Sequence, residues 1–130
     1  MSKDVLKERG ITHILTCALG IKPVFPEDFE YKSMPMLDKA TVGILKFIEE
    51  GCNFLKDCFE KEGKALVHCF VGKSRSTTIV IGYLMKEKKM NLKDSLELVK
   101  SKWEIADPNV GFLLQLKALE MHLFGQNSEV

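Results

Sequence analysis

The spacing of hydrophobic and polar positions changes several times along this 130-residue chain, and each change predicts a different element. Apolar residues that alternate or run together predict three short strands, at 11–15, 29–36 and 64–68. Apolar residues three and four positions apart predict helices at 40–62, 75–88, 92–103 and 112–123, after a short polar helix at 3–9. The stretch 20–28 contains glycine and proline and is expected to be a loop.

Short buried strands separated by helices predict an α/β layer structure with a largely parallel sheet. The length suits one globular domain over residues 1–130, able to bury a core without disulfides or a structural metal. In such sheets ligands bind beyond the carboxyl ends of the strands. The segment that follows the strand at 64–68 lies at such an end.

Composition and charge narrow the function classes. A net charge of +1 gives no strong field that would indicate nucleic acid or a membrane surface. No apolar run approaches the roughly 18 residues of a membrane span, and the N-terminus lacks the apolar core of a signal peptide. The four cysteines form no C-x-x-C pair and no zinc-like cluster with the three histidines. We therefore expect free thiols, no metal or other cofactor, and a cytoplasmic or nuclear location.

The segment 68–77, with the sequence HCFVGKSRST, carries the candidate chemistry. It joins a predicted strand to a predicted helix, and the free N–H groups at a helix start bind anions. A thiol at such a site, here Cys69, has a lowered pKa and is nucleophilic as the thiolate. Arg75 offers a planar fork of donors that matches two phosphate oxygens. The chemistry that fits these features is attack by Cys69 on a phosphate monoester.

The residues of this segment allow two other interpretations. Gly72, Lys73 and Ser74 resemble the end of a nucleotide-binding Walker A loop, but that motif requires a glycine at position 67, which is valine. Cys69 taken alone could be a buried core thiol. The spacing of the surrounding residues argues against both.

The pattern His68-Cys69-x5-Arg75-Ser76 resembles the signature loop of cysteine-dependent protein tyrosine phosphatases. The segments 10–15 and 108–116 are similar to the dual-specificity branch, so the resemblance covers nearly the whole chain. It implies a mixed, mainly parallel sheet of about four to five short strands flanked by helices. It also implies metal-independent hydrolysis of phosphotyrosine and phosphoserine or phosphothreonine.

The resemblance also assigns roles. Cys69 is the nucleophile that forms a phosphocysteine, Arg75 binds two phosphate oxygens, and Ser76 donates a hydrogen bond to the sulfur. His68 either organises the loop from behind or is an ordinary core histidine. The backbone N–H groups expected to hold the phosphate oxygens belong to Phe70, Val71, Gly72, Lys73, Ser74 and Arg75.

The leaving group also needs a proton donor, which the family places on a loop about thirty residues before the cysteine. Asp38 lies 31 positions before Cys69 and follows a predicted strand. It could also cap the next helix. Asp28 precedes the strand and Asp57 lies on the exposed side of a helix, so neither fits.

Some residues depart from the commonest form of the branch. Val71 replaces a small alanine, Trp103 falls near a frequent arginine, and an N-terminal strand is absent or trimmed. Lys73 matches one of two lysines typical of phosphoinositide phosphatases, but Phe70 stands at the other position. A lipid or RNA phosphatase and a non-catalytic phosphate-binding module therefore stay open as alternatives.

The expected partners are phosphorylated proteins, with protein kinases as candidates, although the sequence shows no docking segment for a kinase.

Overall fold

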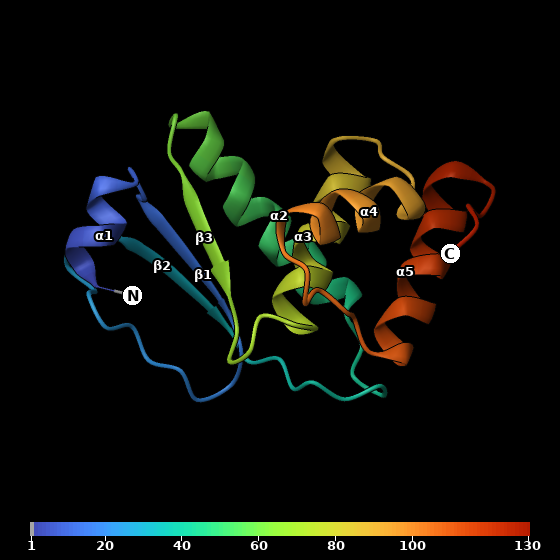
Figure 1. Ribbon diagram of the computed structural model, residues 1–130, viewed down its shortest axis with the longest axis horizontal. Helices are drawn as coiled ribbons and strands as arrows, with labels where there is room; N and C mark the ends of the chain where they lie inside the picture. The colour runs from blue at the N-terminus through green and yellow to red at the C-terminus, as the bar shows by residue number, and fades with distance from the viewer. Residues whose placement is uncertain (1) are drawn as a thin grey trace.

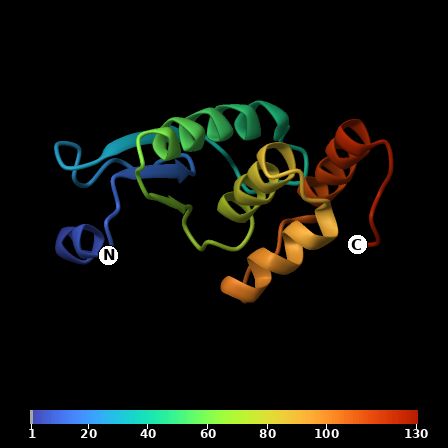
Figure 2. The ribbon, with the colours of Figure 1, turned by 90° about the horizontal axis from the view of Figure 1, so that it is seen from above.

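Three parallel strands form a sheet within residues 2–130, with helices on both of its faces (Figures 1 and 2). The structure, a computed structural model, describes residues 2–130. The strands stand in the order β2-β1-β3. In chain order the elements are α1 Lys3–Glu8, β1 His13–Cys17, β2 Glu30–Met34, α2 Leu45–Glu60, β3 Ala65–His68, α3 Arg75–Glu87, α4 Leu92–Lys102 and α5 Val110–Phe124.

The central strand β1 is buried along its whole length because both faces of the sheet are covered. Successive side chains of a strand point to opposite faces. Leu15 and Cys17 enter the main core, whereas Ile14 packs in a second, smaller core with Leu6 of α1 and Phe29. Seen from above, α2 and α1 lie on opposite sides of the sheet (Figure 2).

Helix α3 is the central helix of the main core. Its residues Ile79, Ile81 and Met85 are fully buried, and it packs against α2, α4, α5 and two strands. The carboxyl ends of the strands and the start of α3 lie close together, at the bottom of the sheet in Figure 1. These contacts hold the first turn of α3 in place beside the ends of the strands.

The α/β class, the parallel pairing and the eight elements agree with the sequence analysis. The strand count differs, because residues 2–130 form three strands rather than four to five. Both strand pairings are parallel, whereas the family resemblance implied a mixed, mainly parallel sheet. The apolar pattern itself predicts three strands, and the larger number came from the family resemblance. No helix among residues 2–130 combines the length and apolar character needed to cross a bilayer.

Helix α2 starts five residues later than its apolar pattern indicates. Its N-cap Ile44 has no side-chain cap; instead, the Ile44 N–H donates to Oε1 of Gln115 over 2.8 Å. The Gln115 amide also donates to the carbonyl of Val42 over 2.7 Å. A side chain 71 residues away in the sequence thus holds the preceding segment out of the helix.

Candidate active site

The loop between β3 and α3 turns sharply so that its backbone faces the sulfur of Cys69. Gly72 has φ +79°, a left-handed conformation that glycine adopts without strain. This turn directs the Gly72 N–H onto Cys69 Sγ, over 3.2 Å. The unpaired N–H groups of the first turn of α3 come directly afterwards. A loop of this form, with donors supplied mainly by the backbone, suits an anion.

Cys69 lies at the base of this loop and is only 9% exposed. Its Sγ is 3.2 Å from Oγ of Ser76, in the first turn of α3. Burial by itself would raise the pKa of the Cys69 thiol. Hydrogen bonds from Ser76 and the Gly72 N–H, together with the positive charge of Arg75, outweigh it and lower the pKa below its usual value. The thiolate is therefore favoured here.

The surroundings of the other three cysteines disfavour the thiolate. Burial raises the pKa of Cys17 to about 12 and that of Cys52 to about 11. Burial also raises the pKa of Cys58. Of the four thiols, only Cys69 lies in surroundings that favour the nucleophilic form.

Arg75, the first residue of α3, links the loop to the segment that follows β2. Its Nη1 donates to the carbonyl of Met36 over 3.1 Å, and its guanidinium stacks on the Phe70 ring, 5.4 Å from the centroid. These contacts fix one end of the fork and hold Arg75 at the rim of the loop.

Asp38 lies two residues beyond Met36, with its side chain exposed. Its Oδ1 accepts a hydrogen bond from the side-chain amide of Asn109, over 2.8 Å. The backbone N–H of Asn109 donates over 2.9 Å to Oγ of Ser74, in the loop of residues 69–75 that we call the phosphate loop. One residue thus connects the segment that carries the candidate acid to the loop that carries the candidate nucleophile.

The Cys69 sulfur, the Gly72 N–H and the Arg75 guanidinium therefore lie on one loop at the carboxyl edge of a parallel sheet. The Asn109 bridge connects the Asp38 carboxylate to the same loop. This set suits transfer of a phosphoryl group to sulfur, because the donors match the charged oxygens of that group.

The sequence comparison agrees with the geometry. Residues 1–122 match the family model "Dual specificity phosphatase, catalytic domain". The chain belongs to this family.

Among its relatives in the family, the "Dual specificity protein phosphatase 1" of Arabidopsis thaliana is 46% identical over 92% of this chain and 60% of its own length. The "MAP kinase phosphatase with leucine-rich repeats protein 3" of Dictyostelium discoideum is 40% identical over 95% of this chain and 14% of its own. A crystal structure of the human "tyrosine phosphatase-like serine/threonine/tyrosine-interacting protein" superposes with TM-score 0.88 and 32% identity, over 92% of this chain and 83% of that one. The chain thus spans less than two thirds of the two curated relatives.

His68 ends β3, just before the nucleophile. Its Nε2 lies 2.9 Å from Oγ1 of Thr16 in the neighbouring strand. Burial lowers the pKa of His68, although a hydrogen bond with the Cys69 backbone partly opposes the shift. A neutral His68 joins β1 to the start of the loop.

The two unusual residues of this family member's loop lie at its rim. Val71 is 67% exposed, so its bulk points away from the core. Nζ of Lys73 lies 4.0 Å from a carboxylate oxygen of Asp107, and the Asp107 N–H donates to the Lys73 carbonyl over 2.7 Å. The charge of Lys73 is therefore partly balanced by a neighbour.

Two residues of this phosphatase domain, Trp103 and Asn109, contact the site although the sequence pattern does not predict these contacts. Trp103 donates from Nε1 to the carbonyl of Gly72 over 2.7 Å, and its indole covers the position a Gly72 side chain would take. Asn109 caps α5, accepting from the Phe112 N–H over 2.8 Å. Its cap position was readable from the sequence, but its amide contact with Asp38 depends on the fold.

Proposed function

We propose that this chain hydrolyses phosphate monoesters on proteins, at phosphotyrosine and at phosphoserine or phosphothreonine, through a phosphocysteine intermediate. The observation that carries the proposal is the environment of Cys69. Its sulfur is within 3.2 Å of both the Gly72 N–H donor and the Ser76 hydroxyl, and it alone among the four thiols has a lowered pKa.

In the first step the Cys69 thiolate attacks phosphorus as the bond to the leaving oxygen breaks. Asp38 gives its proton to that oxygen, so the product leaves as a neutral alcohol or phenol. The loop N–H groups and Arg75 stabilise the charge on the equatorial oxygens. The positive charge needed at the phosphate thus comes from the chain itself, which supports turnover without a metal ion.

In the second step water attacks the phosphocysteine and the sulfur–phosphorus bond breaks. The Asp38 carboxylate takes a proton from that water. The Ser76 hydroxyl, already 3.2 Å from Sγ, donates to the departing sulfur and favours its release as thiolate. Free phosphate and the starting enzyme result.

The reaction is tested with an aryl phosphate in the presence of a metal chelator. We expect turnover that vanadate blocks and that Cys69→Ser abolishes. Asp38→Asn should lower kcat by about 10²–10⁴-fold and leave vanadate affinity intact. Asp28→Asn, the matched control at the rejected position, should keep the parent rate. Absence of turnover with a reduced thiol would contradict the proposal.

The substrate class is a separate question. The name of the Dictyostelium relative indicates a MAP kinase as the substrate of that protein, which supports phosphorylated protein kinases as candidates here. The ion pair between Lys73 and Asp107 argues against a free basic rim for a lipid headgroup. Rates on phosphotyrosine and phosphothreonine peptides, phosphoinositides and RNA 5′-phosphates would rank these classes. Phosphopeptide binding without phosphate release would instead indicate a binding module.

A further inference from the structure

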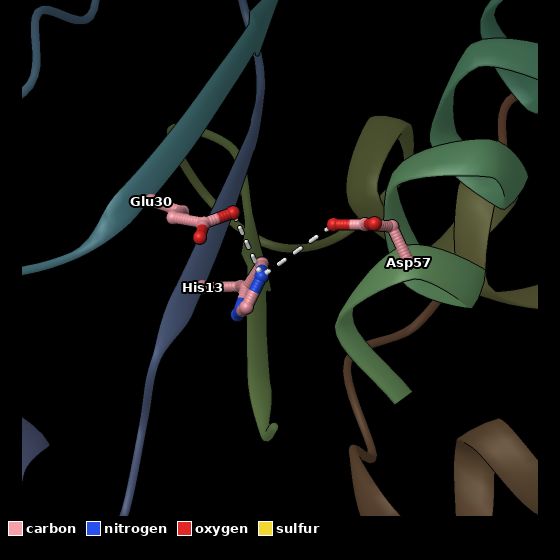
Figure 3. A group of neighbouring side chains, drawn as sticks. All are labelled: His13, Glu30 and Asp57. Carbon is pink, nitrogen blue, oxygen red and sulfur yellow. Dashed lines mark ion pairs between the residues drawn. The ribbon is translucent and has the colours of Figure 1, made fainter. Parts of the chain in front are cut away.

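A second cluster of ionisable side chains lies at the opposite end of the sheet from Cys69. His13 and Glu30 are the first residues of β1 and β2, and they are direct partners in the parallel register. Asp57 reaches them from the last turn of α2 (Figure 3). One imidazole nitrogen and two carboxylate oxygens, one from each residue, all lie within 4.8 Å of one another.

The histidine of this cluster is buried and incompletely satisfied. His13 is 3% exposed, and its Nε2 makes no hydrogen bond with any group of residues 2–130. This nitrogen nevertheless faces the two carboxylates, at 3.1 Å from Oε2 of Glu30 and 4.0 Å from Oδ2 of Asp57 (Figure 3). Buried polar atoms are nearly always paired, and a bound ion is one explanation for an exception.

The other ring nitrogen of His13 has a fixed partner. Nδ1 lies 2.7 Å from Oγ1 of Thr12, and that hydroxyl is itself held by the backbone of Lys64. Histidines that bind metal ions usually have their second nitrogen hydrogen-bonded in this way, which orients the ring. The ring of His13 is thus oriented before any ion arrives.

The charge at the cluster also favours a cation. Two carboxylates face one imidazole ring, and Lys61 is a positive group beside them. Its Nζ lies 3.1 Å from Asp57 and 3.8 Å from Glu30. The Lys61 side chain is 56% exposed and can swing into solvent. A divalent ion would therefore compete with Lys61 for the same two carboxylates.

The ligand spacing suits a small ion after a limited movement. Bonds of about 2.0–2.2 Å in a tetrahedron place ligand atoms about 3.4 Å apart. The 3.1 Å between His13 Nε2 and Glu30 Oε2 is already close to this value. Oδ2 of Asp57, at 4.0 Å from the same nitrogen, needs to move closer by a small rotation of its side chain. The side chains of Glu30 and Asp57 are 58% and 50% exposed, so each can turn toward an ion once its contact with Lys61 breaks. Because both carboxylates are exposed, an ion can reach the cluster directly from solvent.

We propose that His13, Glu30 and Asp57 bind a divalent transition-metal ion such as Zn²⁺, with water completing the coordination. Nitrogen and carboxylate ligands suit ions of this borderline class. The ion would tie together the starts of β1 and β2 and the end of α2. The five residues of β1, at about 3.3 Å each, separate it from the phosphate loop, so the proposal does not depend on the proposed catalytic activity.

Zn²⁺ and Co²⁺ are the probes, used on the Cys69→Ser chain so that the reactive thiol cannot capture them. We expect one ion per chain by calorimetry and a raised thermal midpoint. The Co²⁺ spectrum should lack a sulfur-to-metal charge-transfer band, because no thiolate binds the ion. Glu30→Gln and Asp57→Asn, at exposed positions, should each weaken binding by at least about tenfold.

Two further variants sharpen the test. Lys61→Met removes the competing ammonium and should tighten binding, which a merely structural cluster would not explain. Glu60→Gln removes an exposed carboxylate of the same helix and should leave affinity unchanged. Absence of binding at millimolar Zn²⁺, full affinity in both carboxylate variants, or a thiolate band with Co²⁺ would each overturn the site.

Discussion

The side-chain amide of Asn109 donates a hydrogen bond to Oδ1 of Asp38 over 2.8 Å. Through its backbone N–H, Asn109 also donates to Ser74 of the phosphate loop. The proposed acid is therefore positioned relative to the loop by a residue that takes no part in proton transfer. Arg75 makes a second connection, because it donates to the Met36 carbonyl two residues before Asp38.

Replacing Asn109 by Ser should separate positioning from folding. Serine keeps an oxygen that can cap α5 but lacks the amide that reaches Asp38. We expect kcat for an aryl phosphate to fall several-fold, corresponding to a lost hydrogen bond of about 1 kcal/mol, with KM and the unfolding midpoint near those of the parent. A higher KM with an unchanged kcat would contradict this role.

The pH dependence of Cys69 reactivity should reflect its hydrogen bonds. Because these bonds favour the thiolate, the pKa of Cys69 is lowered, and alkylation by iodoacetamide should reach half its maximal rate below pH 9.0. Ser76→Ala removes one of the donors, so the inflection should move to higher pH. Ser101→Ala, on the exposed side of α4, serves as the control. An inflection that stays in place in Ser76→Ala would show that the hydroxyl does not stabilise the thiolate.

Trp103 should contribute to phosphate binding by supporting Gly72. Trp103→Phe keeps an aromatic ring but removes the N–H that donates to the Gly72 carbonyl. We expect weaker vanadate binding and a stability loss of about 1 kcal/mol, measured by competition kinetics and urea unfolding. Ile105→Ala, an exposed change nearby, should do neither. Because Trp103 is the one tryptophan of the chain, its fluorescence should also change when vanadate binds the parent.

The buried Glu120 should make stability depend on pH. Its carboxylate accepts from the Leu92 N–H over 2.7 Å and from the Ser128 hydroxyl over 2.6 Å. Burial opposes ionisation, but these and further donors outweigh it, so the pKa of Glu120 is lowered from 4.5. A lowered pKa in the folded state stabilises above the unfolded value, and this gain is lost as pH falls through the folded value.

Glu120→Gln should therefore reduce the free energy of unfolding at pH 7 by about 2 kcal/mol. The difference from the parent should shrink as pH falls below 4.5 and through the lowered pKa of the folded state, because the parent carboxyl then becomes protonated. Chemical denaturation at pH 7 and at a pH below 4.5 measures the difference in the free energy of unfolding, with the exposed Glu97→Gln as control. A difference that is constant with pH would mean that the ionised carboxylate is not what stabilises the C-terminal segment.

Local patterns predicted the elements well because each pattern is set by neighbours in the sequence. The helix α3 and the strand β3 are clear from runs of apolar residues on either side of Cys69. The start of α2 is not, since it is set by Gln115 of α5. Gly111 has a similar explanation: a side chain there would collide with the Ala40 backbone, a contact that only the fold creates.

The same division holds at the site. Cys69, Gly72, Arg75 and Ser76 are close in sequence, so their spacing was enough to bring them together in a prediction. The contacts of Asp38 with Asn109 and of Gly72 with Trp103 join residues 71 and 31 positions apart. Contacts between residues so far apart cannot be predicted from the spacing of neighbouring positions in the sequence. Asp57, set aside as an acid, lies instead beside His13 at the far end of the sheet.

Direct capture of the phosphorylated cysteine tests the central claim most sharply. Rapid mixing of enzyme with an aryl phosphate, followed by acid quenching and mass spectrometry of peptides, should place one phosphate on Cys69, with a matching burst of released phenol. Ser76→Ala should increase the trapped fraction, because release of the sulfur is slowed. Turnover with no phosphate on Cys69, or with phosphate on another residue, would contradict the account.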